Sequence, residues 1–229
     1  MSILEVRKLS VEFGHNRVLE DINFEVERGA VLAIIGPNGA GKTVLLKSLI
    51  GLLPYNGVVQ WAPDVRIGYV PQRMDIETDV PLTVREFFGL RGGGLTPDRI
   101  REVLEFVQLD EHILNAGLGE ISIGQRQRVL VAWSVIGSPD VLLFDEPTAD
   151  IDVTGQESIY KMLYHLQKNL GLTIILVSHD LNVVYRHATS VLCLNRSKLC
   201  FGVPREVLSS EQLLSLYGGE KAFFEHKHD

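Results

Sequence analysis

The stretch "GPNGAGKT", residues 36–43, decides the fold of this chain, because it fits the pattern GxxxxGK[ST]. It follows the apolar run "AVLAII" and precedes the apolar sequence "VLLKSLIGLL". A strand, a glycine-rich loop and a helix in this order are typical of a phosphate-binding loop, or P-loop. Gly36, Gly39 and Gly41 let the backbone bend tightly and turn its N–H groups toward phosphate oxygens, and the helix adds its positive end.

Two side chains at the end of this loop carry its chemistry. We expect Lys42 to reach the β- and γ-phosphates and the Thr43 hydroxyl to ligate Mg²⁺. A glycine-rich turn that happens to contain Lys-Thr is the alternative, and the strand and helix on either side disfavour it. The predicted nucleotide-binding residues of the loop are Gly36, Pro37, Asn38, Gly39, Ala40, Gly41, Lys42, Thr43 and Val44.

Length and composition fit a folded α/β protein. The chain has 229 residues and a net charge of -7, which argues against a nucleic-acid duplex as the main partner, since that partner usually binds a basic face. No apolar run approaches the ~18 residues that a membrane-spanning helix needs, so we expect any membrane role to be peripheral. Cys193 and Cys200 form no CxxC pair, which disfavours zinc ligation and a redox motif, and two separate thiols indicate a reducing compartment.

Apolar runs along the chain predict the sheets. Residues 30–35, 141–144, 173–177 and 191–194 are apolar without alternation, as in strands of a parallel sheet that is covered on both faces. In "DINFEVERG", by contrast, Ile22, Phe24 and Val26 alternate with polar residues, which predicts a strand with one wet face and an antiparallel patch near the N-terminus.

Helical spacing predicts the rest of the fold. Two stripes have i, i+3, i+4, i+7 spacing and are expected to pack in the core, and Thr96 and Pro97 suit the cap and first turn of the first helix. The stripes are Ile100, Val103, Leu104 and Val107, and Ile159, Met162, Leu163 and Leu166. The sequence therefore predicts a single α/β domain, residues 1–229, with a P-loop (RecA-like) parallel-sheet core and an N-terminal antiparallel β patch. The core is expected at 1–81 and 138–201, an inserted helical subdomain at 82–137, and a helical tail with one weak helix, "REVLSSEQLLSLYG", at 202–229.

Polar side chains follow three of the predicted strands. "VLLFDEPTADID" ends a strand with Asp145 and Glu146, and strand ends of this kind face the ligand crevice of a doubly wound sheet. We expect Asp145 to hold Mg²⁺ and Glu146 to polarise a water for attack on the γ-phosphate. His179, in "LVSHDL", lies at the same edge and can donate to a γ-phosphate oxygen. Gln72, in "IGYVPQR", offers an amide to Mg²⁺ or to the attacking water. The predicted catalytic set is Lys42, Gln72, Glu146 and His179, and the predicted Mg²⁺ set is Thr43, Gln72 and Asp145.

"LGEISIGQRQRVLVAW", residues 118–133, begins another predicted helix. Ser122 and Gln125 have the S-x-x-Q spacing of a capping box, and the helix is expected to run to Gly137. A capped N-terminus is also an anion site, so the Ser122 hydroxyl and the Gly124 N–H can meet a γ-phosphate. Ile123 fits this role only if its φ is negative, because a β-branched residue at positive φ is strongly disfavoured.

In this order, "GPNGAGKT", "PQR", "ISIGQRQR", "LLFDEPTADID" and "LVSHD" resemble the motifs of the ATP-binding-cassette (ABC) ATPases, over essentially the whole chain. The resemblance implies ATP and Mg²⁺ as cofactors and stacking of Phe13, in "VEFGHNRVL", on adenine. It implies a head-to-tail homodimer in which ATP lies between the P-loop of one copy and the signature of the other. The further ATP-binding residues implied are Ser122, Gly124, Gln125 and the D-loop acid Asp152.

The resemblance also implies a cellular location and partners for the protein. The chain would lie on the cytoplasmic face of a bacterial plasma or inner membrane, as a peripheral subunit. A separate permease would dock near residues 73–95, and a solute-binding protein would be an indirect partner; no nucleic acid is expected. "IGYVPQR" before "VPLTVREF", "DVTGQ" and "VSHDLNVV" look like the zinc/manganese importer branch. Import of another solute, such as haem or a siderophore, stays open.

Three features stand apart from the motif pattern. Ile123 replaces the first glycine of the signature, and Asp150 stands where the D-loop usually has Ala or Gly. The end of the chain, "EHKHD", is similar to the His-containing tails of some zinc importer ATPases. His226 and His228, however, are spaced i, i+2, which does not define a metal site.

Two other function classes are consistent with a P-loop. A soluble ABC ATPase can act as a conformational switch, for example on ribosomes or DNA, but such proteins usually carry two cassettes or a coiled-coil insertion. A small-molecule kinase does not need "ISIGQRQR". The sequence therefore favours a transport motor.

Overall fold

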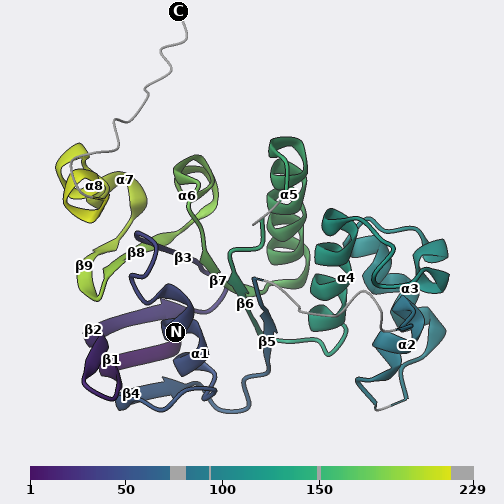
Figure 1. Cartoon of the computed structure of the whole chain (residues 1–229), viewed down its shortest axis with the longest axis horizontal. Helices are drawn as coiled ribbons and strands as arrows, with labels where there is room; N and C mark the ends of the chain where they lie inside the picture. The colour runs from purple at the N-terminus through teal and green to yellow at the C-terminus, as the bar shows by residue number, and fades with distance from the viewer. Residues whose placement is uncertain (73–80, 93, 149–150, 218–229) are drawn as a thin grey trace, which may run out of the picture.

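Two β-sheets form the centre of the protein (Figure 1). The computed structural model describes residues 1–72, 81–92, 94–148 and 151–217. The smaller sheet is antiparallel in the order β2-β1-β4. Its strand β2 buries Ile22, Phe24 and Val26 on one face, which confirms the predicted alternation. The bounds of its strands are β1 Ser2–Phe13, β2 Asn16–Glu27 and β4 Asn56–Trp61.

The larger sheet has six strands in the order β5-β6-β7-β3-β8-β9. Neighbours from β5 to β8 are parallel, and β9 is antiparallel to β8. Every residue of β3, β6 and β7 is buried, which explains why these runs do not alternate. The bounds are β3 Val31–Ile35, β5 Ile67–Val70, β6 Val141–Asp145, β7 Thr173–Val177, β8 Ser190–Asn195 and β9 Ser197–Gly202.

Strand β3 shows how the layers share one sheet. Leu32 and Ile34 pack with the smaller sheet and helix α1, whereas Ala33 and Ile35 pack on the opposite face with α6 and α8. In Figure 1, α5, α6 and α8 lie above the larger sheet, and α1 and the smaller sheet lie below it. The bounds are α1 Lys42–Leu49, α5 Val153–Leu170, α6 Leu181–His187, α7 Pro204–Val207 and α8 Ser210–Tyr217. Within the described residues, no helix is both long and apolar enough to cross a membrane.

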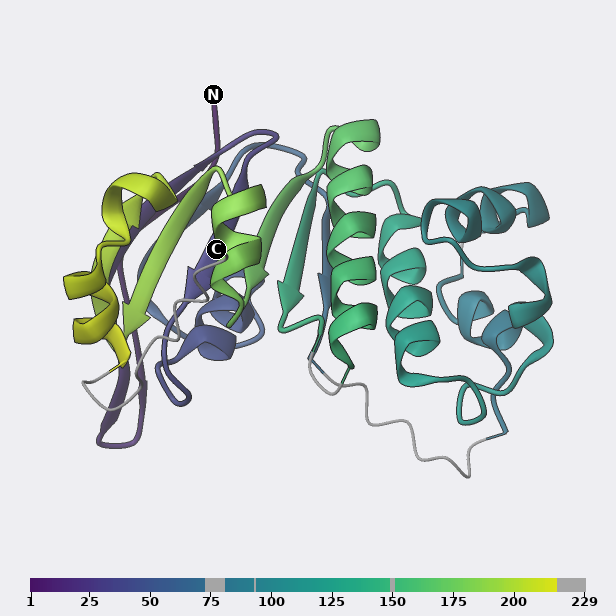
Figure 2. The ribbon, with the colours of Figure 1, turned by 90° about the horizontal axis from the view of Figure 1, so that it is seen from above.

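The chain between β5 and β6 is helical in the residues that the structure describes and lies at one end of the molecule (Figure 2). Its elements are α2 Val84–Gly89, α3 Pro97–Phe106, the 3-10 helix η1 Glu111–Asn115 and α4 Ile123–Val135. The Thr96 side chain accepts from the Arg99 N–H and Pro97 begins α3, so the predicted cap and first turn are confirmed. The division of the chain into an α/β core, a helical subdomain and a tail stays a prediction.

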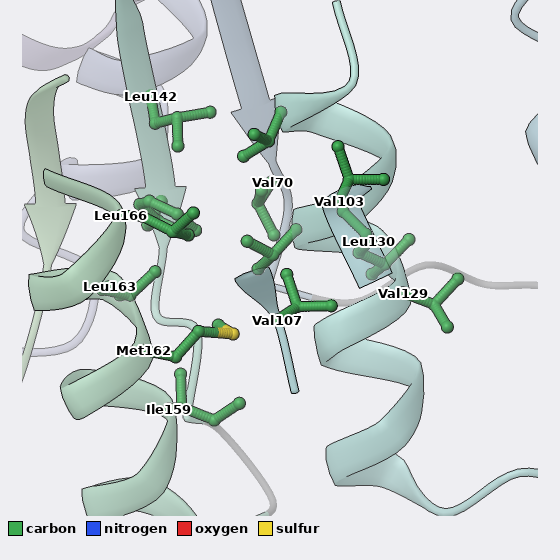
Figure 3. Close-up of a cluster of buried hydrophobic side chains, with 14 of the residues drawn as sticks. Val70, Val103, Val107, Val129, Leu130, Leu142, Ile159, Met162, Leu163 and Leu166 are labelled. Atoms are coloured by element: carbon green, nitrogen blue, oxygen red, sulfur yellow. The ribbon is translucent and has the colours of Figure 1, made fainter. Parts of the chain in front are cut away.

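A cluster of apolar side chains joins this helical segment to the larger sheet. Figure 3 shows side chains of α3, α4 and α5 gathered beside Val70 of β5 and Leu142 of β6. The α5 stripe is buried. In α3, Val103 and Leu104 are buried and Ile100 is half-buried, and Val107, the C-cap of α3, is also buried. Both helical stripes therefore pack in the core, as their spacing predicted.

Two predictions about helix ends were wrong. Helix α4 ends at Val135 with Ile136 as its C-cap, short of Gly137. The stretch "REVLSSEQLLSLYG" forms two helices, α7 and α8, and not one. The break follows from Ser209, whose hydroxyl accepts from the Gln212 N–H and so caps a new helix start.

The expectation of two free thiols was also wrong. Cys193 of β8 and Cys200 of β9 lie opposite each other in the antiparallel register and are joined by a disulfide. Their separation of seven residues does not reveal the tight β8–β9 hairpin that brings them together.

Leu166→Ala tests the core of Figure 3. We expect the free energy of unfolding to fall by about 2–5 kcal/mol, because the truncation leaves a cavity among packed side chains. Leu166 is 0% exposed, whereas Leu170, one turn further along α5, is 39% exposed. Leu170→Ala is therefore the matched control, with an expected loss below about 1 kcal/mol. Urea unfolding followed by circular dichroism measures both, and equal losses would contradict the packing described.

Candidate functional site

The P-loop connects β3 to α1, and close packing fixes its shape. A Cβ on Gly36 would lie 2.0 Å from the carbonyl oxygen of Leu194, in β8. Gly41, the N-cap of α1, has φ 95°, and a Cβ there would meet the Leu19 side chain at 2.6 Å. The loop is also supported from the β8–β9 hairpin, since the Arg196 N–H donates to the Ala40 carbonyl over 3.2 Å. Glycine is thus required at these two positions by space as well as by conformation.

Lys42, the first residue of α1, lies inside the loop. Its side chain is 5% exposed, and Nζ donates to the Gly36 and Pro37 carbonyls at 2.9 and 3.0 Å. Nζ also lies 3.6 Å from the Glu146 carboxylate. Burial lowers the pKa of Lys42, and the attraction of Glu146 opposes this change. The loop and the carboxylate together compensate the buried ammonium group.

Asp145 ends β6 and is buried beside the first turn of α1. Its Oδ1 accepts from the Thr43 hydroxyl at 3.0 Å, and Oδ2 lies 3.4 Å from the Tyr69 hydroxyl. Burial raises the pKa of Asp145, while the bond from Thr43 favours the ionised form. A hydroxyl and a carboxylate at this distance are hard oxygen donors of the kind that Mg²⁺ prefers. Thr43 and Asp145 therefore fit the predicted Mg²⁺ site.

Glu146 follows directly and connects three predicted catalytic residues. Its Oε1 is 2.6 Å from His179 Nε2, and its Oε2 accepts from Gln72 Nε2 at 3.0 Å. The hydrogen bond with His179, together with the charge of Lys42, lowers the pKa of Glu146 although burial opposes it. The carboxylate is thus held in the ionised form that a general base requires.

The backbone of Glu146 is strained, since its φ of 49° is in the left-handed region. For a residue other than glycine this conformation costs roughly 1–2 kcal/mol. The sharp turn after β6 directs the carboxylate toward Lys42 and His179. Gln72 donates to Glu146 and has no hydrogen bond with Thr43 or Asp145, and both of its predicted partners, Mg²⁺ and the attacking water, stay predictions.

Some of these residues line a cavity of about 460 Å³, and one lining residue was missed from the sequence. Val18 of β2 faces the cavity from outside the P-loop. Val18 and Leu19 are adjacent in a strand, so their side chains point to opposite faces, and the buried Leu19 leaves Val18 facing outward. Two adjacent apolar residues in a strand could therefore have indicated from the sequence that Val18 faces outward. The cavity is lined by Val18, Asn38, Gly39, Gly41, Lys42, Thr43, Val44, Gln72 and Glu146.

The signature residues have the predicted local structure but lie elsewhere. The Gln125 N–H donates to the Ser122 hydroxyl at 3.2 Å, and the Ser122 N–H donates to Gln125 Oε1 at 3.0 Å, which confirms the capping box. Ile123 begins α4 with a helical backbone and not a positive φ, which meets the condition set for its role, and its side chain is 53% exposed. Ser122, Gly124 and Gln125 do not line the P-loop cavity.

Other predicted residues do not line this cavity either, among them Asp145 and His179. Phe13, at the end of β1, is 45% exposed, and its stacking role stays a prediction. Asp152 caps α5 by accepting from the Gly155 N–H at 3.3 Å. Asp150, His226, His228 and residues 73–80 of the predicted docking segment lie outside the described residues. Among the residues that are described, no group of three or more His, Cys, Asp or Glu side chains is arranged to hold a metal ion.

Known proteins resemble this chain in sequence and structure. The ABC transporter family matches residues 19–149. The zinc import ATP-binding protein ZnuC of Rickettsia prowazekii (strain Madrid E) is 36% identical over 228 residues, which are 99% of this chain and 97% of that protein. A transporter described as of the metal-chelate ABC type, in an inward-facing conformation, has a TM-score of 0.84 at 26% identity, over 94% of this chain and 88% of that chain. CbiO1 of Clostridium perfringens, part of the ABC transporter complex cbiONQ, has a TM-score of 0.78 at 29% identity, over 93% of each chain.

Glu146→Gln tests the function of the central carboxylate. We expect ATP hydrolysis to fall by about a hundredfold or more, because the amide cannot accept a proton from the attacking water, while ATP still binds. Phosphate release measures turnover, and the fluorescence of a labelled ATP analogue measures binding. Glu157→Gln, an exposed change on α5, is the control. Turnover at the wild-type rate in Glu146→Gln would show that another group is the base.

Proposed function

This chain belongs to the ABC transporter family, and from this premise we propose that it is the ATP-hydrolysing subunit of an importer whose cargo is zinc. ATP-binding subunits of this family are ATPases, and this chain is one of them. The observation that carries the zinc proposal is the 36% identity to a zinc import ATP-binding protein over 99% of this chain. The likeness to a metal-chelate transporter supports a metal as cargo.

Hydrolysis begins, in our proposal, with the contacts of Lys42. Its Nζ now lies near Glu146, and the triphosphate of ATP offers it stronger anionic partners. A phosphate held by Lys42 and the P-loop N–H groups leaves Glu146 free to accept a proton from the attacking water. His179 and Gln72, both in contact with Glu146, orient the carboxylate and the water. Mg²⁺, held by Thr43 and Asp145, would neutralise phosphate charge when bound.

The P-loop cavity provides only one side of the ATP site in this proposal. Ser122 and Gly124 lie at the exposed, capped start of α4, outside that cavity. A head-to-tail homodimer brings this helix start to the γ-phosphate bound by the other copy, where its N–H groups stabilise the anion. Phe13 stacks on the adenine, and Val18 packs beside it. The negative φ of Ile123 is consistent with this use of the helix start.

The proposed partners follow from the proposed transport role. A separate membrane permease docks near residues 73–95, a segment that includes α2, and a solute-binding protein delivers the metal to the permease. The subunit is peripheral to the cytoplasmic face of a bacterial plasma or inner membrane. Manganese is the alternative cargo of the same branch, and the metal content of cells distinguishes the two.

Deleting the gene tests the cargo. We expect cellular zinc to fall by about twofold or more during growth at low zinc, with manganese and iron unchanged, because the importer then lacks the subunit that hydrolyses ATP. Mass spectrometry of whole cells measures all three metals. The wild-type gene is expected to restore zinc, and the Glu146→Gln gene is not. Loss of manganese alone would transfer the cargo assignment to manganese, and unchanged metals would refute metal import.

A further inference from the structure

Three hydroxyl groups, two of them on buried residues, form a hydrogen-bonded chain beside the catalytic residues. The Tyr160 hydroxyl, on α5, lies 3.1 Å from Thr148 Oγ1 and 3.1 Å from Ser178 Oγ. A tyrosine hydroxyl has one proton, so Tyr160 donates to one neighbour and accepts from the other. Tyr160 and Ser178 are both buried, and burial raises the pKa of Tyr160, which keeps its proton in place. The protonated Tyr160 hydroxyl can therefore form both hydrogen bonds, one to Thr148 and one to Ser178.

The two ends of this chain belong to the two loops that carry the catalytic pair. Thr148 lies two residues after Glu146, in the loop that follows β6. Ser178 directly precedes His179, in the loop that follows β7. The Ser178 hydroxyl also accepts from the Asp180 N–H at 3.1 Å. This hydrogen bond joins the residue before His179 to the residue after it. Tyr160 thus connects the loop of the base to the loop of its partner.

Helix α5 supports the first loop a second time. The Gln156 amide donates to the Ile151 carbonyl at 2.8 Å, and the Ile151 N–H donates to the Thr148 carbonyl at 3.2 Å. Gln156 and Tyr160 are four residues apart, so they lie on the same face of the helix. A cavity of about 330 Å³ lies beside this face, and Glu146, His179 and Tyr160 all line it. Tyr160 does not line the P-loop cavity, so any effect of its hydroxyl on hydrolysis is transmitted through the two loops.

We propose that Tyr160 is a positioning residue for ATP hydrolysis, whose hydroxyl holds the loops of Glu146 and His179 at the spacing that keeps these two side chains in contact. The contact is short, 2.6 Å between His179 Nε2 and Glu146 Oε1, and it requires the two loops to keep their spacing. Misplacement of a catalytic group by about 1 Å can cost on the order of a hundredfold in rate. The proposal rests on Glu146 as the base, which is part of the proposed function.

Tyr160→Phe removes the hydroxyl and keeps the ring. In the full-length protein we expect kcat for ATP to fall about tenfold and KM for ATP to stay within about twofold, because the P-loop contacts are intact and only the hydrolytic pair moves. The melting temperature is measured for each variant, so that a loss of fold is recognised. Tyr164→Phe, one turn further along α5 at an exposed position, is the matched control and is expected to keep the wild-type kcat.

Thr148→Val removes the same connection from the other end. If the hydroxyls act as one unit, Thr148→Val also lowers kcat, and the double variant with Tyr160→Phe falls no further than the single variants. Independent, multiplying losses would overturn the bridge as a unit. If Tyr160→Phe does not fold, Thr148→Val decides alone, and a wild-type kcat in it overturns the proposal.

Glu146→Gln, measured beside these variants, distinguishes a failure of the role of Tyr160 from a failure of Glu146 as the base. Loss of turnover in Glu146→Gln together with a wild-type kcat in Tyr160→Phe would overturn the role of Tyr160 and leave the proposed function standing. Turnover retained in Glu146→Gln would instead overturn the assignment of the base, and with it the reason for positioning that residue. A selective fall of kcat in Tyr160→Phe, with Glu146→Gln inactive, supports both.

Discussion

The site depends on one buried positive charge. An ammonium group removed from water is costly unless anions or carbonyl oxygens compensate it. Lys42 obtains this compensation from two carbonyls of its own loop and from Glu146. Glu146 is in turn held by His179 and Gln72. One buried cation thereby fixes how the ends of β3, β5, β6 and β7 meet, and the parallel sheet places these ends along one edge.

The same charge connects packing to chemistry. A triphosphate and the Glu146 carboxylate are both anions that Lys42 can hold, so in the proposed reaction nucleotide binding exchanges one for the other and leaves the carboxylate to act on water. In this structure the pKa of Glu146 is lowered first by the hydrogen bond with His179 and then by the charge of Lys42. Behind the site, the hydroxyl of Tyr160 joins the two loops whose side chains must then stay in contact. The charge of Lys42 therefore positions Glu146 beside the P-loop, and the neutral hydrogen bonds of Tyr160 position the two loops that carry Glu146 and His179.

Much of this could be predicted from sequence because the signals are local. Unbroken apolar runs identified the buried strands, and the Ser122 capping box followed from a three-residue spacing. What failed depends on partners distant in the chain or on a single competing bond. The Cys193–Cys200 disulfide needs the hairpin register, and the α7–α8 break needs the cap at Ser209. The Tyr160 contacts join segments that only the fold brings together, so no spacing of residues in the sequence predicted them.

In the proposed homodimer, this chain holds half of each ATP site and a second copy completes it through Ser122. Sedimentation velocity of the Glu146→Gln variant tests this directly, because bound ATP then persists. The account predicts a monomer without nucleotide, a dimer with ATP and Mg²⁺, and a monomer in both conditions when Ser122→Arg is added. A protein that stays monomeric with ATP, or a Ser122→Arg variant that dimerises equally well, would contradict it.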